Sequence, residues 1–267
     1  MEKSMIKVVL GAMIGLFCLG LCPKAAGQMI SSESYSANAD TLPIGENSEK
    51  PSAEIFFIAY TLDGEDPATR PLSFVFNGGP GASSVYLHLG ALGPRTLEVP
   101  GDGSFPEPPG RLQKNISSWL AFTDLVFVDP VGTGYSRPLG ADKASNPEQG
   151  SEQEVQGARA EPGQSVSEGN TKAFWGVEND LKSLGQFIRL YLTRFGRWTS
   201  PKALVGESYG GRRVAALSRS LMEDFDIAIN LAVLISPALH SNIGPEGRRH
   251  SLLPWATLLP TQTAIAD

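Results

Sequence analysis

Ser208 lies between two glycines, where an apolar run gives way to a pattern typical of a helix. The spacing Gly206-x-Ser208-x-Gly210 is typical of a nucleophile elbow, a turn so tight that the residues beside the serine must be small. Such a turn lifts the hydroxyl clear of a sheet and places the Tyr209 N–H, at the new helix start, to face a developing oxyanion. The spacing therefore predicts a serine nucleophile, with a plain glycine-rich turn as the alternative.

A second glycine-rich stretch, 77–81 (NGGPG), follows another apolar run. Glycines allow backbone N–H groups to approach a ligand, and acyl transfer needs two such donors around the oxyanion. We therefore predict that this loop supplies the second donor, while a tight turn or a phosphate-binding nest stays open. A complete serine hydrolase also needs a base and an acid that orients it.

Strands and helices must alternate to position these two loops. Apolar runs predict strands at 55–60, 71–76, 124–129 and 229–235, and one directly before the elbow. Apolar residues at helical spacing predict a helix over 173–195, capped by Gly196. The elbow predicts a second helix, from Tyr209 to about 222. This alternation predicts the α/β class, with a mostly parallel sheet flanked by helices.

Composition narrows the classes of partner. The 267 residues are 41% hydrophobic, enough for a substantial core. A net charge of −6 gives no indication of a nucleic-acid partner or an anionic membrane surface. No cofactor or metal site is predicted. Both cysteines, Cys18 and Cys22, lie in the N-terminal targeting segment, so the mature chain should have no disulfide, no thiol nucleophile and no cysteine metal site.

The N-terminal segment 1–27 predicts a signal peptide cut near Gly27. Lys3 and Lys7 precede an uncharged apolar run over 8–22, which is short for a membrane span. A membrane anchor or a lipoprotein signal is the alternative. The sequence thus predicts a secreted or periplasmic protein with no membrane contact after cleavage, and the lack of further cysteines favours a periplasm.

Two segments show no hydrophobic periodicity. Residues 28–52 are polar and are predicted to form a disordered leader, and 138–171, poor in large apolar side chains, a disordered insertion. The folded domain is predicted to cover 53–267, with no indication of its oligomeric state.

Five motifs occur in the order seen in serine carboxypeptidases, and the chain resembles the amino-terminal half of that family over about 53–260. The cysteine-poor sequence looks closest to its bacterial branch. The motifs are 77–84 (NGGPGASS), 92–94 (LGP), 124–136 (DLVFVDPVGTGYS), 174–175 (FW) and 206–210 (GESYG).

The resemblance implies an α/β-hydrolase fold and a role for each matched residue. Ser208 corresponds to the acylated serine, and the amides of Gly79 and Tyr209 to the oxyanion hole. The groups that hold the terminal carboxylate of a peptide or protein substrate correspond to Asn77, the Gly78 amide and Glu207. Asn side chains and backbone N–H groups are suitable donors for a carboxylate. Glu207 can contribute only when it or the substrate carboxyl is protonated, and an ordinary variable elbow residue is the alternative.

The sequence departs from the family at two of these motifs. Ala82 replaces the usual cysteine of the glycine-rich loop, so that disulfide is missing. Ala91 stands where better-known members have a glutamate that pairs with the one at Glu207. We therefore expect that any active form prefers acidic pH less strongly than those members do.

The triad acid and histidine of the family follow the serine well downstream, and the chain ends before them. We therefore expect a truncated form whose sheet lacks its last strands, which leaves an exposed edge. His88 is expected to pack on a short helix, whereas His240 could lie near a strand end and His250 at the start of a cap. Asp224 and Asp226 precede their strand, on the wrong side of the sheet.

Three functions remain open from the sequence. The favoured one is a serine carboxypeptidase that lacks its Asp and His. An esterase or acyltransferase on the same fold is the second, and an inactive remnant or binding protein is the third. Arg212 and Arg213 could influence the pocket electrostatically, although a solvated helix face is favoured.

Overall fold

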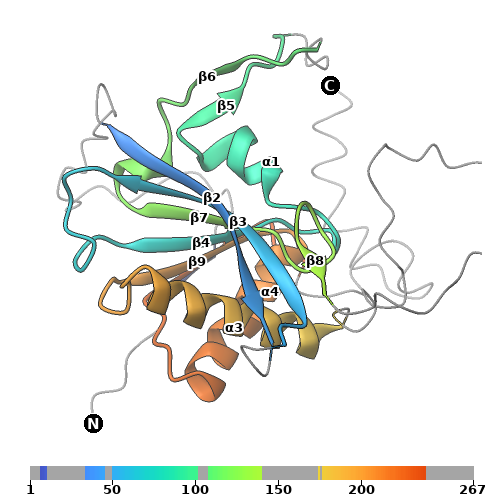
Figure 1. Cartoon of the computed structure of the whole chain (residues 1–267). Helices are drawn as coiled ribbons and strands as arrows, with labels where there is room; N and C mark the ends of the chain where they lie inside the picture. Colours follow the sequence, from blue (N-terminus) through green and yellow to red (C-terminus); the bar gives the residue numbers. More distant parts are fainter. Residues whose placement is uncertain are drawn as a thin grey trace, which may run out of the picture.

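The computed structural model describes residues 34–45, 50–101, 108–139, 174 and 176–238, and the backbone of 7–10. An eight-stranded sheet forms the centre of this part, with strand order β1-β10-β9-β4-β7-β3-β2 and β8 paired to β3 (Figure 1). The strands are β1 (Lys7–Leu10), β2 (Tyr35–Ile44), β3 (Ala53–Leu62), β4 (Leu72–Phe76), β5 (Arg95–Leu97), β6 (Leu112–Lys114), β7 (Asp124–Val128), β8 (Arg137–Pro138), β9 (Lys202–Glu207) and β10 (Leu231–Ile235). The helical elements are α1 (Val85–Leu87), the π-helix η1 (His88–Leu92), the 3-10 helix η2 (Trp119–Ala121), α3 (Val177–Arg194) and α4 (Tyr209–Asp224).

The centre of the sheet is parallel. Strands β1, β10, β9, β4 and β7 run in one direction, while β7 pairs with β3, and β3 with β2, in antiparallel fashion. Every residue of β4 and β7 is buried, which explains why both are unbroken apolar runs in the sequence. The expected mostly parallel sheet is confirmed.

Helices α3 and α4 cover one face of the sheet, and the short elements α1, η1 and η2 contribute to the opposite core (Figure 1). Helix α3 begins after Gly176, whose φ of 114° suits glycine, and Gly196 follows its end at φ 65°. Gly185 lets the two helices approach, because a Cβ there would lie 2.3 Å from the Phe225 ring. Buried aromatic side chains such as Phe57, Phe74 and Phe187 fill the space beneath them.

The predicted disordered leader over 28–52 is wrong for Tyr35–Ile44, which forms β2 along the whole length of β3. Only Leu42 and Ile44 of this strand are buried, while 36–39 are exposed. The segment therefore lacks the alternation by which a strand is normally predicted. The strand is held instead by backbone hydrogen bonds to β3, and such bonds leave no pattern in the sequence.

The outer edge of β10, expected to be exposed, carries β1 in parallel register from Lys7 opposite Leu231. Strand β1 lies within the predicted signal peptide 1–27, and the rest of that segment lies outside the described residues. The predicted insertion 138–171 also lies outside them, apart from its first two residues. Within the described ranges, every helix is too short or too polar to cross a bilayer.

A network of buried ion pairs lies at the amino ends of the parallel strands β4, β7 and β9. Asp124 Oδ1 contacts Arg70 Nε at 2.8 Å, and Asp124 Oδ2 contacts Arg197 Nη1 at 2.7 Å. The Leu62 N–H also donates to Asp124, at 3.1 Å, and Arg197 Nε donates to the Ser200 hydroxyl at 2.7 Å. The three charged side chains are at most 8% exposed, so each charge depends on these partners rather than on water.

Candidate active site

The turn from β9 into α4 places Ser208 in a strained conformation. Its φ of 56° and ψ of −119° lie in a region that non-glycine residues rarely adopt. Hydrogen bonds hold the turn: the Ser208 N–H donates to Ile235 O at 2.9 Å, and the Ala238 N–H to Ser208 O at 2.9 Å. Gly206 must be small, because a Cβ there would lie 2.0 Å from Gly210 O. The geometry is that of a nucleophile elbow.

The 77–81 loop lies directly against this elbow. A Cβ on Gly78 would be 2.8 Å from both Glu207 O and Ser208 Cβ, and 2.9 Å from the Tyr209 nitrogen. Gly79 follows with a φ of 105°, which also favours glycine. The sequence folds this way because β4 and β9 are parallel neighbours, with Phe76 opposite Gly206, so that both loops leave the same sheet edge.

The side chains of Asn77 and Glu207 meet beside the serine. The Asn77 amide nitrogen donates to Glu207 Oε2 at 3.3 Å, and Asn77 Oδ1 accepts from the Leu87 N–H at 2.9 Å. The Leu87 bond fixes the orientation of the amide, so its N–H₂ group faces Glu207. Among the described residues, Glu207 thus contacts an amide rather than a second carboxyl group.

A cavity of 480 Å³ brings these groups together. It is lined by Asn77, Gly78, Gly79, Ala82, Tyr86, Leu87, Glu207 and Ser208. Five of the six candidate residues therefore share one hollow. The sixth, Tyr209, lines an adjoining cavity of 270 Å³ with Pro80 and Gly81, while its nitrogen faces Gly78.

Tyr86 was missed by the sequence reasoning. It is 69% exposed at the cavity. Its position on α1, just after the 77–84 motif, is the one signal that could have indicated it. The described side chains gather no group of three or more potential metal ligands.

Comparison with known proteins gives a family match for the chain. The serine carboxypeptidase (peptidase S10) family model matches residues 44–236, which is most of the chain. The chain belongs to the serine carboxypeptidase family. The fold agrees: the solved KEX1(delta)P, a prohormone-processing carboxypeptidase from Saccharomyces cerevisiae, superposes with a TM-score of 0.59 at 22% identity, over 85% of this chain and 42% of that one. The predicted α/β-hydrolase fold is thereby confirmed.

Two curated members of the serine carboxypeptidase family show the extent of the match. The pheromone-processing carboxypeptidase KEX1 of Lachancea thermotolerans is 26% identical over 207 residues, 74% of this chain and 22% of its own length. Serine carboxypeptidase S10 family member 1 of Dictyostelium discoideum is 24% identical over 225 residues, 80% and 45% respectively. The chain thus spans less than half the length of these relatives. The bacterial branch is not borne out, since these relatives are a yeast and a slime-mould protein.

His88 packs in the core, as the sequence predicted. It does not line the cavity that contains Ser208, so it is not in position to act as the base. It lies on η1, with its Nε2 2.7 Å from the Tyr60 hydroxyl and its ring stacked near Phe127. Burial lowers the pKa of His88 to about 4, so the imidazole is neutral at pH 7. Asp226 lies at the amino end of β10, on the wrong side of the sheet as predicted. His240 and His250 lie outside the described residues.

We expect His88 to make the domain less stable in acid. Its pKa is about 4 when folded and near 6.5 when unfolded, so between these values the unfolded chain binds the extra proton. The stability is therefore complete above pH 6.5 and is lost as the pH falls toward 4, by at most about 3.4 kcal/mol. Urea unfolding across this range should show the loss in the parent chain and a smaller one in His88→Gln, which keeps a partner for Tyr60. Parallel curves for the two proteins would contradict this.

The Asp129 carboxylate binds the backbone at the end of the 77–84 segment. Its Oδ1 accepts from the Ser84 N–H at 2.8 Å, and its Oδ2 from the Tyr135 N–H at 3.3 Å. Burial raises the pKa of Asp129, although these two amides and the charge of Arg137 oppose the shift. The 124–136 motif thus has a structural role, because it ties the end of β7 to the end of the 77–84 segment.

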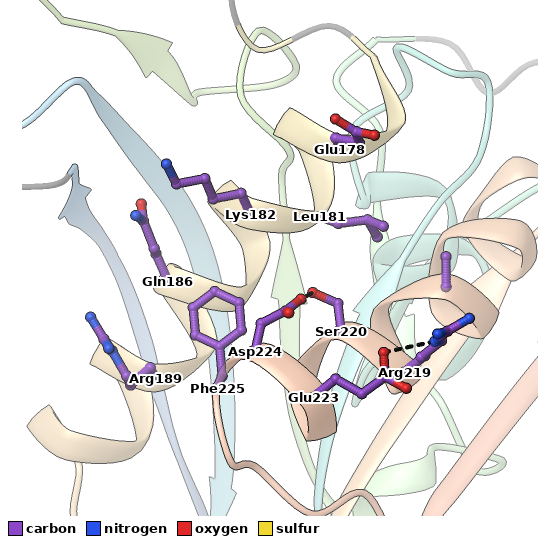
Figure 2. A pocket seen from close by; sticks show the side chains of 11 residues that line it. Glu178, Leu181, Lys182, Gln186, Arg189, Arg219, Ser220, Glu223, Asp224 and Phe225 are labelled. Carbon is purple, nitrogen blue, oxygen red and sulfur yellow. Dashed lines mark hydrogen bonds and ion pairs between the residues drawn. The ribbon is translucent and has the colours of Figure 1, made fainter.

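A larger cavity of 610 Å³ lies between α3 and the second half of α4 (Figure 2). Figure 2 shows Lys182, Gln186 and Arg189 along α3, with Phe225 near Arg189, while Glu223 on α4 turns toward Arg219. None of the six candidate residues lines it. At 1.5 Å per helical residue, Arg219 is roughly 16 Å along α4 from Ser208, so the larger cavity is separate from the elbow.

Proposed function

We propose that this site is suited to serine-type carboxypeptidase chemistry on peptide or protein C-termini, provided that a base reaches Ser208. The observation that carries the proposal is the single cavity shared by Asn77, Gly78, Gly79, Glu207 and Ser208. The cavity places the nucleophile beside donors that could bind the free carboxylate of the residue that follows the attacked peptide bond. A secreted or periplasmic location, from the predicted signal peptide 1–27, belongs to the same proposal.

In the proposed reaction, Ser208 Oγ attacks the carbonyl carbon of the last peptide bond and passes its proton to a base, which the described residues around the cavity do not supply. The resulting oxyanion accepts hydrogen bonds from the Gly79 and Tyr209 N–H groups. When the intermediate collapses, the C–N bond breaks and the protonated amine of the last residue leaves. Water then attacks the acyl-enzyme and releases the shortened peptide, with the hydroxyl proton returned to Ser208.

The leaving residue is recognised by its free carboxylate. The Asn77 amide and the Gly78 N–H are donors, and Glu207 can add a hydrogen bond when one carboxyl group is protonated. Because Glu207 faces the Asn77 amide at 3.3 Å, a bound carboxylate competes with Glu207 for that donor.

We expect the chain to bind a dipeptide acid more tightly than its amide. The probes are N-acetylphenylalanylleucine and its C-terminal amide, titrated by calorimetry. A hydrogen bond to a charged group contributes about 1.5–3 kcal/mol, so the acid should bind roughly 10- to 100-fold more tightly. Asn77→Ala should reduce this preference, whereas Asn38→Ala, on the exposed part of β2, should not. Equal binding of acid and amide would exclude the carboxypeptidase and favour the esterase or acyltransferase alternative.

We also propose that Ser208 is not activated in this chain by itself. Within the described residues no imidazole lines its cavity, and His88 is paired with Tyr60. A fluorophosphonate probe should therefore leave Ser208 unlabelled, as mass spectrometry of the intact chain would show. Labelling that disappears in Ser208→Ala would mean that a base, such as His240 or His250, does reach the serine.

A further inference from the structure

Arg213 is buried behind the site, although the sequence favoured a solvated helix face for it. It lies one turn after Tyr209 on α4 and is 5% exposed. Its Nε contacts Asp180 Oδ2 at 2.7 Å, and its Nη1 donates to the Asn77 carbonyl oxygen at 3.0 Å. Its guanidinium carbon is 5.2 Å from the centre of the Tyr209 ring, within range of a cation–π interaction. One side chain therefore contacts both segments that supply the proposed donors.

The bond to Asn77 determines where the Gly78 N–H points. A trans peptide unit is planar, and its C=O and N–H groups point in opposite directions. The Asn77 carbonyl and the Gly78 N–H belong to one such trans unit. Gly210 packs against the same unit, since a Cβ there would lie 2.8 Å from Asn77 O. A guanidinium that holds the carbonyl on the α4 side thus directs the N–H away from α4.

Asp180 makes this arrangement possible in a buried place. A buried arginine without a partner is strongly unfavourable, and Asp180, with a 15% exposed side chain, supplies the opposite charge. Asp180 lies in the first turn of α3, where the helix dipole favours an acid. Arg212, the neighbouring arginine, is less buried and 5.9 Å from the Tyr209 ring.

We propose that Arg213, held by Asp180, is a positioning residue that orients the Gly78 amide for a substrate carboxylate. The role of the amide rests on the proposed carboxypeptidase function. The orientation of the amide does not, because it follows from the hydrogen bond to Asn77 O alone. The two can therefore be tested separately.

The test compares two double variants, each of which removes one arginine of α4 together with its acidic partner. Arg213→Met with Asp180→Leu removes the bond to Asn77 and leaves no unpaired buried charge, so the domain should still fold. Arg219→Met with Glu223→Leu removes an exposed ion pair of the same kind and serves as the matched control. Urea unfolding first establishes that both variants fold.

The first measurement uses no ligand. In protein labelled with nitrogen-15 glycine, the Gly78 amide order parameter should be that of rigid backbone, about 0.85, in the parent chain and in the control. It should fall below about 0.6 in the Arg213–Asp180 variant. An unchanged value there would overturn the proposal.

The second measurement repeats the titration with N-acetylphenylalanylleucine. The Arg213–Asp180 variant should bind the acid at least about tenfold more weakly than the control, with the amide affected less. Equal loss for acid and amide would indicate a merely structural role and overturn the proposal. If the parent chain does not prefer the acid, the carboxypeptidase function fails, and the order parameter alone decides the role of Arg213.

Discussion

Asp124→Asn should cost the domain about 3–5 kcal/mol of its free energy of unfolding, the range expected when one partner of a buried ion pair is removed. Asp124 contacts both Arg70 and Arg197, with side-chain distances of 2.8 and 2.7 Å. The amide would leave both guanidinium groups buried beside a neutral partner. Domains are typically stable by about 5–15 kcal/mol, so the loss would be a large share of the total. Urea unfolding followed by tryptophan fluorescence measures the loss.

Two controls separate burial from charge in this experiment. Glu223→Gln breaks the ion pair with Arg219, whose side chains are 57% and 77% exposed, and should change the stability by less than about 1 kcal/mol. Replacing Arg70, Asp124 and Arg197 together by Met, Leu and Met removes every charge and should recover much of the stability. A loss below about 1 kcal/mol for Asp124→Asn would show that the network is not what holds the amino ends of the strands.

Gly206→Ala should disrupt both the elbow and the fold around it. The new Cβ would lie 2.0 Å from Gly210 O and 2.3 Å from Gly210 C, which are backbone atoms of α4. No side-chain rotation can relieve that overlap, so α4 must move away from β9. We expect a loss of about 3 kcal/mol or more in the free energy of unfolding. The preference for the dipeptide acid should disappear as well, because Glu207 and Ser208 move with the turn.

Gly90→Ala is the matched control for the added methyl group. Gly90 is exposed on η1, and a Cβ there meets nothing within 4 Å. This variant should keep the acid preference and be between unchanged and about 1 kcal/mol more stable. A Gly206→Ala protein that unfolds and binds like the parent chain would contradict the close approach of β9 and α4.

Local patterns were sufficient for most of the elements. Helix α3 was predicted from apolar spacing and α4 from the elbow motif, and their buried residues include Leu184, Ile188 and Leu217. Strand β2 could not be predicted, because most of its side chains are exposed and it is held by backbone pairing with β3. Exposed edge strands carry little hydrophobic signal, so the tertiary context decides them.

The sequence alone determined the motif that marks the elbow at Ser208, the glycine-rich loop at 77–81 and their order along parallel strands. These are local features, since a tight turn requires glycine whatever surrounds it. Only the tertiary structure decided that Arg213 is buried and bound to Asn77 O, and that Asp124 bridges Arg70 and Arg197. Charged residues far apart in the chain read as solvated from sequence, because their burial depends on partners that folding alone brings within hydrogen-bond distance.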